Sequence, residues 1–145
     1  MVEPIRVLFV CTHNSARSQL AEALLRRAGG DDFDVHSAGT AVTRVHPLAT
    51  RVLADLGIDT SGARSKSVAE FEGQPFDHVI TVCDQAREAC PVFPGARSTQ
   101  HWSLDDPSMV EGSEADRLAA FQRTADEIAD RLRPFIETAR RARRG

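Results

Sequence analysis

The chain has 145 residues, 41% of them hydrophobic and 27% charged, and a formal net charge of −3 at pH 7. This length is typical of a single domain, which we expect to span residues 1–145. The acidic balance argues against a general nucleic-acid binder, because such proteins need a basic face. No run approaches the ~18 apolar residues of a membrane span, and the N-terminus lacks the pattern of a secretory signal. We therefore expect a cytoplasmic protein without membrane contact.

The first predicted element is the short apolar run Ile5–Val10, which is rich in β-branched residues and typical of a buried central strand. It ends directly at Cys11. Apolar residues then recur at helical spacing from Leu20 to Ala28, until two glycines end the pattern. The N-terminal segment is thus predicted to form a strand, a turn and a helix.

Further strands and helices alternate along the chain. In chain order, the pattern predicts a strand at Phe33–Ser37, a helix at Pro47–Gly57, a strand at Phe76–Val82, a weaker strand at Arg97–Trp102 and a long helix from Ser113, kinked near Pro134. This alternation predicts an α/β fold with an open parallel four-stranded sheet flanked by helices on both faces. Such sheets bind ligands beyond the carboxyl ends of their strands, where we expect Cys11 and Cys83 to lie.

The candidate catalytic motif is a cysteine and an arginine separated by five residues, Cys11 and Arg17, between the first strand and the first helix. A loop in this position directs backbone N–H groups inward, and the helix N-terminus adds positive potential, so the loop can bind a tetrahedral oxyanion. The Arg17 guanidinium offers a bidentate fork, and the same field stabilises a thiolate nucleophile at Cys11. The predicted oxyanion-binding residues are Thr12, His13, Asn14, Ser15, Ala16, Arg17 and Ser18.

Two of these residues have predicted supporting roles. We expect the Ser18 hydroxyl to hydrogen-bond the Cys11 thiolate, and Asn14 to hold the loop in its inward-facing shape. The alternative is that Cys11 is a small apolar residue closing a strand and Arg17 a surface cation. The position of the motif at a strand-to-helix junction favours the catalytic interpretation.

The segment Val7–Gln19 (VLFVCTHNSARSQ) resembles the phosphate loop of low-molecular-weight protein tyrosine phosphatases and their arsenate reductase relatives. Ser37–Thr40 resembles the second-strand segment of that family. Two later segments, Thr81–Pro94 and His101–Pro107, resemble the thioredoxin-coupled arsenate reductases. The resemblance covers most of the chain and implies an arsenate reductase.

By this resemblance, Asp106 is the general acid that protonates the departing oxygen. Arsenate reduction also needs two electrons. The resemblance implies that Cys83 attacks the Cys11 sulfur, so that arsenite departs, and that Cys90 then carries the disulfide to thioredoxin or another thiol reductant. Phosphate and sulfate would compete as oxyanions. Without the resemblance, the alternative interpretation is that Asp106 is a turn aspartate and that Cys83 and Cys90 are ordinary buried residues.

Two other functions remain open from the sequence. A phosphatase hydrolysing phosphate monoesters needs only a thiolate, an arginine cradle and an acid, because water completes its reaction. A phosphocarrier would hold a phosphoryl group without turnover. The chain contains no tyrosine, which counts against a tyrosine phosphatase, whose Asp-Pro loop usually carries aromatic residues.

Some of these reductases bind potassium beside the phosphate loop through Asn, Ser, Thr and Asp side chains. Here Arg64 and Lys66 fall where the threonine and aspartate would be. Cationic side chains repel a metal ion, so we expect the potassium site to be absent and replaced by a tethered positive charge. The five histidines lack metal-ligand spacing, and no dinucleotide fingerprint follows a strand. We therefore expect no metal and no organic cofactor.

Overall fold

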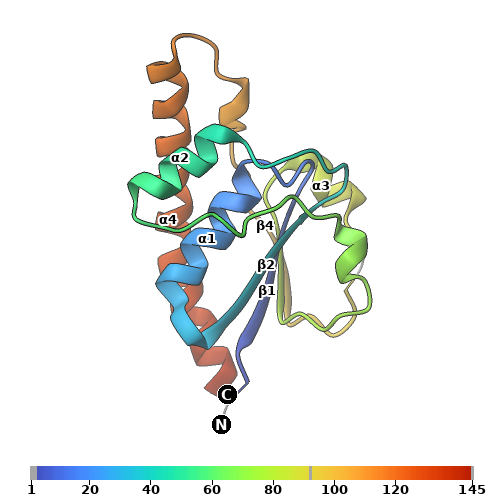
Figure 1. Cartoon of the computed structure of the whole chain (residues 1–145). Coiled ribbons are helices and arrows are strands. Elements are labelled where there is room, and N and C mark those ends of the chain that lie inside the picture. Colours follow the sequence, from blue (N-terminus) through green and yellow to red (C-terminus); the bar gives the residue numbers. More distant parts are fainter. Residues whose placement is uncertain (1–2, 92, 145) are drawn as a thin grey trace.

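The computed structural model describes residues 3–91 and 93–144. Its centre is the predicted parallel sheet of four strands, and the structure places these strands in the order β2-β1-β3-β4 (Figure 1). The strands are β1 (Ile5–Cys11), β2 (Phe33–Gly39), β3 (His78–Thr81) and β4 (Ser98–His101). The helices are α1 (Arg17–Gly29), α2 (Pro47–Asp55), α3 (Asp84–Ala89) and α4 (Glu114–Arg144), with short 3-10 turns η1 (Gly30–Asp32), η2 (Val68–Phe71) and η3 (Pro107–Met109).

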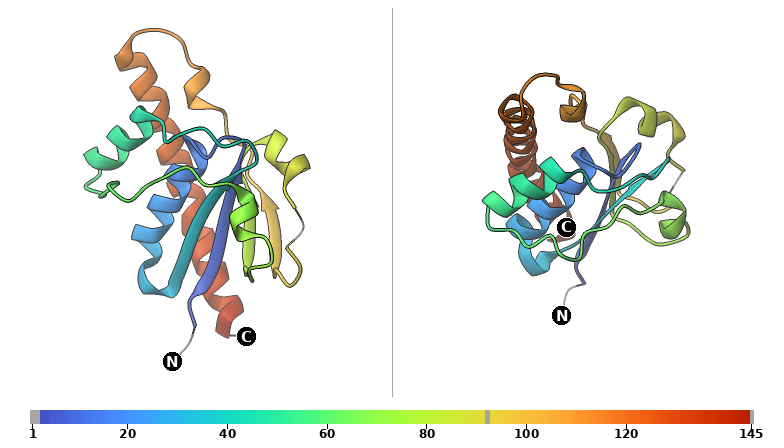
Figure 2. Two further views of the ribbon diagram at one scale, coloured as in Figure 1. Left: turned by 45° about the vertical axis from the view of Figure 1, so that its right-hand side comes forward. Right: turned by 45° about the horizontal axis from the view of Figure 1, so that its top comes forward.

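Helices cover both faces of the sheet (Figure 2). On the face toward α1 and α4, the Phe33 ring lies 6.3 Å from Phe135 of α4. On the opposite face, toward η2 and α3, the His36 ring lies 5.4 Å from Phe71 of η2. Successive strand residues point to opposite faces, and both faces are buried. This explains why β1 is apolar at every position except Arg6, rather than alternating between apolar and polar residues.

The element boundaries differ from the sequence prediction in a few places. β3 is shorter than the predicted run from Phe76 to Val82. Next to its first residue, the Asp77 carboxylate rather than a backbone carbonyl accepts the Arg6 N–H, at 2.8 Å. α2 ends at Asp55, two residues early. The predicted long helix is present as α4, which contains Pro134 and ends at Arg144.

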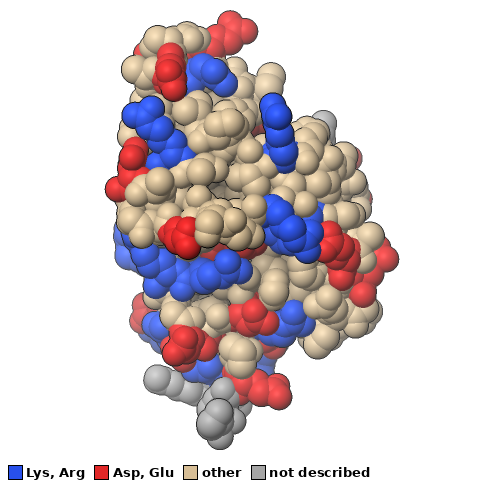
Figure 3. All heavy atoms as spheres, viewed as in Figure 1, with Lys and Arg blue, Asp and Glu red and all other residues tan. Residues whose placement is uncertain are grey.

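The basic end of α4 is tied to the body of the protein. Arg140 and Arg143 pair with Asp32 at 2.9 and 3.1 Å, and the Arg140 guanidinium lies 5.8 Å from the centre of the Phe33 ring. On the face drawn in Figure 3, positive and negative side chains are interspersed rather than gathered by sign. Within residues 3–91 and 93–144, no helix is both long and apolar enough to cross a membrane.

The strand order places the candidate site. From β1 the chain goes to β2 on one side, while β3 and β4 lie on the other, so the topology switches direction at β1. In open parallel sheets the crevice at such a switch point, beyond the carboxyl ends of the strands, is the usual ligand site. The residues that follow β1 and β3 therefore meet at this edge of the sheet.

Candidate active site

The phosphate loop connects the end of β1 at Cys11 to the start of α1 at Arg17. It curls around the Cys11 sulfur: the Asn14 backbone N–H donates to Sγ at 3.2 Å, and the Ser18 hydroxyl lies 2.7 Å from Sγ. Cys11 is 3% exposed. The predicted contact between Ser18 and the Cys11 sulfur is present.

The N-terminus of α1 faces the loop without a competing acceptor. Ala16 occupies the N-cap position and supplies no side-chain hydrogen bond, and the first turn contains no acidic residue. Helix N-termini usually have such partners, because their first N–H groups lack intrahelical acceptors. Here these groups and the positive end of the helix dipole are left available to a bound anion.

Asn14 holds the loop in shape. It is the one non-glycine residue with a positive φ, 51°, in the part of the chain that the structure describes. Its side-chain oxygen accepts the Lys66 backbone N–H at 2.8 Å and the Gln19 amide at 3.1 Å. Its side-chain nitrogen donates to the Ser37 and Ser18 hydroxyls at 2.9 and 2.8 Å. These contacts support the left-handed backbone that asparagine tolerates better than most residues.

Gly39, at the end of β2, provides the space in which the loop lies. A Cβ atom on Gly39 would lie 2.7 Å from the Thr12 carbonyl oxygen and 2.8 Å from the Asn14 nitrogen. The next residues bind the loop backbone, since the Thr40 N–H donates to the Cys11 carbonyl at 3.2 Å and the Ala41 N–H to the Thr12 carbonyl at 2.7 Å. Only glycine permits this close approach.

Arg17 and Asp106 form an ion pair at the wall of a small cavity. Arg17 Nη1 donates to the Leu104 carbonyl at 2.9 Å, and Nη2 lies 3.6 Å from Asp106 Oδ2. Asp106 is oriented by Ser108, whose backbone N–H and hydroxyl donate to Oδ1 at 3.0 and 2.7 Å. The cavity has a volume of about 50 Å³ and is lined by Cys11, His13, Ser15, Ala16, Arg17, Asp106 and Ser108.

The structure thus places most of the predicted residues at the wall of this cavity. The others lie near it but make different contacts. Asn14 and Ser18 are fully buried and lie behind Cys11 rather than at the cavity wall. Thr12 points to the second cysteine: its hydroxyl lies 3.1 Å from Cys83 Sγ. The catalytic and binding roles of all these residues remain predictions.

The two later cysteines lie at opposite ends of α3. Cys83 is 6% exposed and occupies the N-cap position, two residues beyond the end of β3, while Cys90 follows the last helical residue. Burial raises the pKa of Cys90 to about 11. Cys11, Cys83 and Cys90 are all free thiols. At a rise of 1.5 Å per residue, an intact α3 holds the Cα atoms of Cys83 and Cys90 about 10 Å apart.

A larger groove of about 730 Å³ lies between β4 and the C-terminal half of α4. It is lined in part by Trp102, Phe135 and Arg131, and none of the three cysteines faces it. The candidate site, with Cys11 in its wall, is therefore not the larger of these two cavities. The described residues also contain no group of three or more His, Cys, Asp or Glu side chains placed to hold a metal ion.

Sequence reasoning assigned no role to several residues that support the loop. Glu22 is 8% exposed on α1, and its carboxylate accepts the Ser37 hydroxyl at 2.6 Å. Gln19 donates to Asn14 from one turn away. The sequence did contain an indication for Glu22. It lies four residues after Ser18, so both residues are on the same buried face of the helix. A carboxylate among apolar neighbours on such a face needs a partner.

Comparison with known proteins identifies the class. A match to the family described as low molecular weight phosphotyrosine protein phosphatase spans residues 6–144, and the chain belongs to this family. A curated relative, the arsenate reductase of Halalkalibacterium halodurans, is 38% identical over 134 residues, which are 92% of this chain and 96% of the relative.

Solved structures fall in the same two groups. The thioredoxin-dependent arsenate reductase of Corynebacterium glutamicum is 30% identical with a TM-score of 0.76, over 98% of this chain and 65% of that chain. The low molecular weight protein tyrosine phosphatase of T. tengcongensis is 28% identical with a TM-score of 0.75, over 92% of this chain and 99% of that one. One scaffold therefore carries both activities among the proteins that this chain resembles.

Proposed function

We propose that the protein is a single-domain arsenate reductase that converts arsenate to arsenite through Cys11, Cys83 and Cys90. The observation that carries this proposal is the 3.1 Å contact between the Thr12 hydroxyl and the Cys83 sulfur, which ties a second thiol to the residue next to the nucleophile. A phosphatase has no use for that thiol. The names of the relatives at 38% and 30% identity agree with this function.

Substrate binding depends on the positive potential of the loop and of Arg17. Arsenate is a tetrahedral oxyanion, and the loop amides, the α1 N-terminus and the Arg17 guanidinium all present N–H donors to the cavity. The bond from Arg17 Nη1 to the Leu104 carbonyl holds the guanidinium at the cavity wall. Phosphate and sulfate have the same shape and are expected to compete for this cradle.

In the first chemical step, the Cys11 thiolate attacks arsenic and a sulfur–arsenic bond forms. An arsenic-bound hydroxyl leaves as water and takes its extra proton from Asp106, which lines the same cavity. Ser108 fixes the orientation of that carboxyl group through two hydrogen bonds to Oδ1, leaving Oδ2 turned toward Arg17. Arsenic remains in the +5 state in this adduct.

In the second step, the Cys83 thiolate attacks the Cys11 sulfur. A Cys11–Cys83 disulfide forms, the sulfur–arsenic bond breaks, and its electron pair stays on arsenic, which leaves as arsenite in the +3 state. The two thiols supply the two electrons. The Thr12 hydroxyl holds Cys83 on the loop side of α3 for this attack.

In the third step, the Cys90 thiolate attacks Cys83, which frees Cys11 and leaves a Cys83–Cys90 disulfide. A disulfide requires Cα atoms about 4.4–6.8 Å apart, so the ~10 Å span of an intact α3 must shorten. Six-residue helices are marginal by themselves, and Cys83 provides no side-chain cap. We therefore infer that α3 unwinds during the relay and presents the disulfide to thioredoxin or another thiol reductant.

Weak hydrolysis of phosphate monoesters is a second candidate activity. The match to the phosphatase family and to the T. tengcongensis phosphatase favours it, and the cradle, Cys11 and Asp106 suffice for a phosphocysteine that water hydrolyses. No Phe, Tyr or Trp is among the residues that line the described cavity. Without an aromatic ring to hold a phosphotyrosine, we expect this activity to be low.

The test is to measure arsenite formation from arsenate with thioredoxin, glutaredoxin and mycothiol systems offered separately, beside hydrolysis of an aryl phosphate. Multiple-turnover arsenite formation with one of these reductants is expected, and Cys11→Ser should abolish it. Rapid phosphotyrosine hydrolysis without any arsenite would show a phosphatase instead. Stoichiometric phosphorylation without release would show a phosphocarrier.

A further inference from the structure

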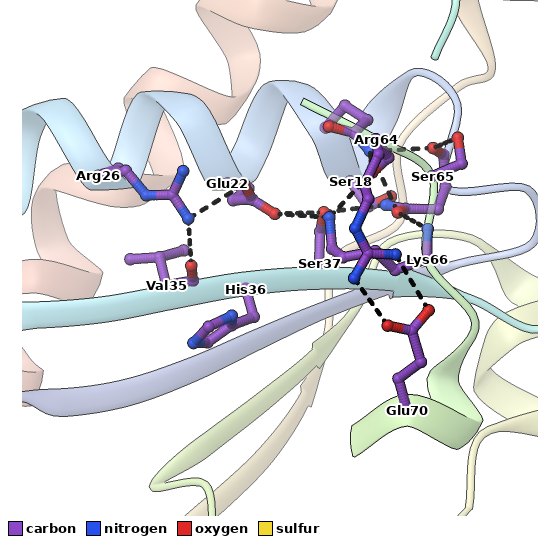
Figure 4. Close-up of polar contacts among 12 residues, drawn as sticks. Ser18, Glu22, Arg26, Val35, His36, Ser37, Arg64, Ser65, Lys66 and Glu70 are labelled. Carbon is purple, nitrogen blue, oxygen red and sulfur yellow. Dashed lines mark hydrogen bonds and ion pairs between the residues drawn. The ribbon is translucent and has the colours of Figure 1, made fainter. Parts of the chain in front are cut away.

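A largely buried ion pair, Glu22 and Lys66, lies beside the phosphate loop (Figure 4). Lys66 Nζ is 3.4 Å from Glu22 Oε1, and the two side chains are only 11% and 10% exposed. Glu22 comes from α1 and Lys66 from the segment before η2. Charged side chains are seldom buried to this degree unless they are paired, because desolvation costs several kcal/mol per ion. An ion pair enclosed to this degree therefore suggests a specific structural role.

Glu22 sets the direction of a hydrogen-bond chain that ends at the catalytic sulfur. The Ser37 hydroxyl donates to Glu22 Oε1 at 2.6 Å, so its oxygen is left to accept from Asn14 Nδ2 at 2.9 Å. The second hydrogen of Asn14 Nδ2 goes to the Ser18 oxygen at 2.8 Å. Ser18 thus keeps its own hydrogen for Cys11 Sγ, 2.7 Å away.

The orientation of the Asn14 amide is also determined from its other side. Its oxygen accepts N–H donors from Lys66 and Gln19, so its nitrogen must face the two serine hydroxyls. Lys66 therefore acts twice: its backbone N–H orients Asn14, and its ammonium group neutralises the carboxylate at the start of the chain. The result is a hydroxyl donor aimed at Cys11, the arrangement that stabilises a thiolate.

A potassium ion does not fit among these residues. Such an ion needs several free oxygen ligands, but here the oxygens already have donors. Lys66 Nζ donates to the Arg64 carbonyl at 3.0 Å, and Arg26 lies 3.1 Å from Glu22 Oε2. The Lys66 ammonium group occupies the position between the Glu22 carboxylate and the Arg64 carbonyl that a cation would take.

The side chain of Arg64 plays no such part, although Arg64 is only two residues before Lys66. Its guanidinium turns outward to Glu70, with Nη2 2.8 Å from Oε1 and a side-chain exposure of 62% (Figure 4). The expected tethered positive charge is therefore Lys66 alone. Arg64 provides a matched control, because it is a nearby cation of the same segment whose side chain points away from the loop.

We propose that Lys66 is a built-in cation and that the Glu22–Lys66 pair is a positioning device for the catalytic loop, making the protein independent of a bound monovalent cation. The proposal rests on Cys11 being the nucleophile of the proposed function. Its tests, however, read the reactivity of Cys11 and the binding of inorganic phosphate, which need no arsenate reduction. The role of Lys66 and the arsenate reductase activity can therefore be contradicted independently of each other.

The main experiment compares Lys66→Met with Arg64→Met in a chain whose Cys83 and Cys90 are both replaced by serine, so that Cys11 is the one remaining thiol. Alkylation of Cys11 by iodoacetamide is followed against pH, and phosphate binding by calorimetry. For Lys66→Met we expect half-maximal alkylation about one pH unit higher and phosphate affinity reduced about tenfold. Arg64→Met should change neither by more than about twofold.

Two further variants keep the test decisive if Lys66→Met folds poorly. Glu22→Gln combined with Lys66→Met leaves no unpaired buried charge, and its alkylation profile should still shift upward, because an amide oxygen is a weaker acceptor than a carboxylate. Lys66→Ala opens space for an ion, so potassium at constant ionic strength should restore part of its phosphate affinity. The parent chain should bind phosphate equally in sodium and potassium.

Equal effects of Lys66→Met and Arg64→Met on Cys11 alkylation would overturn the proposal. A clear potassium dependence of phosphate affinity or melting temperature in the parent chain would do the same, since it would show a cation site that Lys66 does not fill. An unshifted alkylation profile in the double variant would also contradict it.

Discussion

The Thr12 hydroxyl lies 3.1 Å from the Cys83 sulfur and so joins the phosphate loop to the second cysteine. Thr12→Val removes this contact while keeping the branched shape of the side chain. A single hydrogen bond of net ~1 kcal/mol corresponds to about a fivefold change. We therefore expect disulfide formation between Cys11 and Cys83 to slow by about that factor, with phosphate binding unchanged. Rapid-quench mapping of the disulfide measures this step.

Thr12→Ser is the matched control, because it retains the hydroxyl and should keep a rate near that of the parent chain. An equal loss of phosphate affinity and of disulfide formation in Thr12→Val would instead show that the residue supports the loop as a whole.

The order of the relay is tested by replacing each cysteine. Cys11→Ser should abolish all chemistry, since a serine hydroxyl is not ionised near neutral pH. Cys83→Ser should block reduction but leave oxyanion binding intact, because that sulfur is not part of the cradle. Cys90→Ser should complete one turnover and trap a Cys11–Cys83 disulfide. Peptide mapping after one equivalent of arsenate distinguishes this product from the Cys83–Cys90 disulfide expected in the native chain.

If Cys83→Ser retained full multiple-turnover reduction with thioredoxin, the three-cysteine mechanism would be wrong. An external thiol would then have to attack the Cys11 adduct directly.

Gly39→Ala should disturb the phosphate loop through one added carbon. Its Cβ would lie within 2.7–2.9 Å of backbone atoms of Thr12, His13 and Asn14, none of which can move without opening the loop. Overpacking of this kind costs about 1–3 kcal/mol, a fall in melting temperature of roughly 2–12 °C for a chain of this size. Phosphate affinity should fall as well. Differential scanning fluorimetry with and without phosphate measures both effects.

Gly62→Ala is the control for this substitution, because a Cβ on Gly62 meets no atom within 4 Å. It should leave the melting temperature and the phosphate-induced shift unchanged. A Gly39→Ala chain as stable and as responsive to phosphate as Gly62→Ala would contradict the close packing described above.

Cys90 should be unreactive while α3 is intact. Burial raises the pKa of Cys90 from the ordinary thiol value of 9.0 to about 11, so near pH 8 its thiolate fraction should be about 100-fold below that of a free thiol. In a Cys11→Ser/Cys83→Ser chain, iodoacetamide should therefore modify Cys90 slowly until the pH approaches 11. Alkylation as fast as that of an unfolded control at pH 8 would show that α3 is already open.

The same pKa predicts a pH dependence of stability. The folded state keeps the Cys90 proton to higher pH than the unfolded state, so its contribution is complete below about pH 9 and is lost as pH rises toward 11. The free energy of unfolding of the parent chain, relative to Cys90→Ser, should therefore decline between these two pH values. Urea titrations at several pH values measure the difference, and a rise over this range would contradict it.

The main elements and the region around Cys11 could be predicted from the sequence because their signals are local. The run Ile5–Val10 is apolar at every position but one, which only a strand buried on both faces requires. The change to helical spacing after Ser18 defines α1, and the Cys11–Arg17 spacing lies at the junction of the two. The weaker strand predicted at Arg97–Trp102 is also present as β4, with the slightly narrower bounds Ser98–His101.

The sequence thus determined the strand, the loop and the helix of the Cys11–Arg17 motif, whereas the tertiary structure decided how that loop is held. Lys66 meets Glu22 across 44 positions of the chain, and Thr12 meets Cys83 across 71. Residue type did not distinguish Lys66 from Arg64, yet the Lys66 side chain is largely enclosed beside a carboxylate and the Arg64 side chain faces solvent. Local periodicity carries no information about such pairs, because they form only when the parallel sheet brings the carboxyl ends of β1, β2 and β3 to one edge.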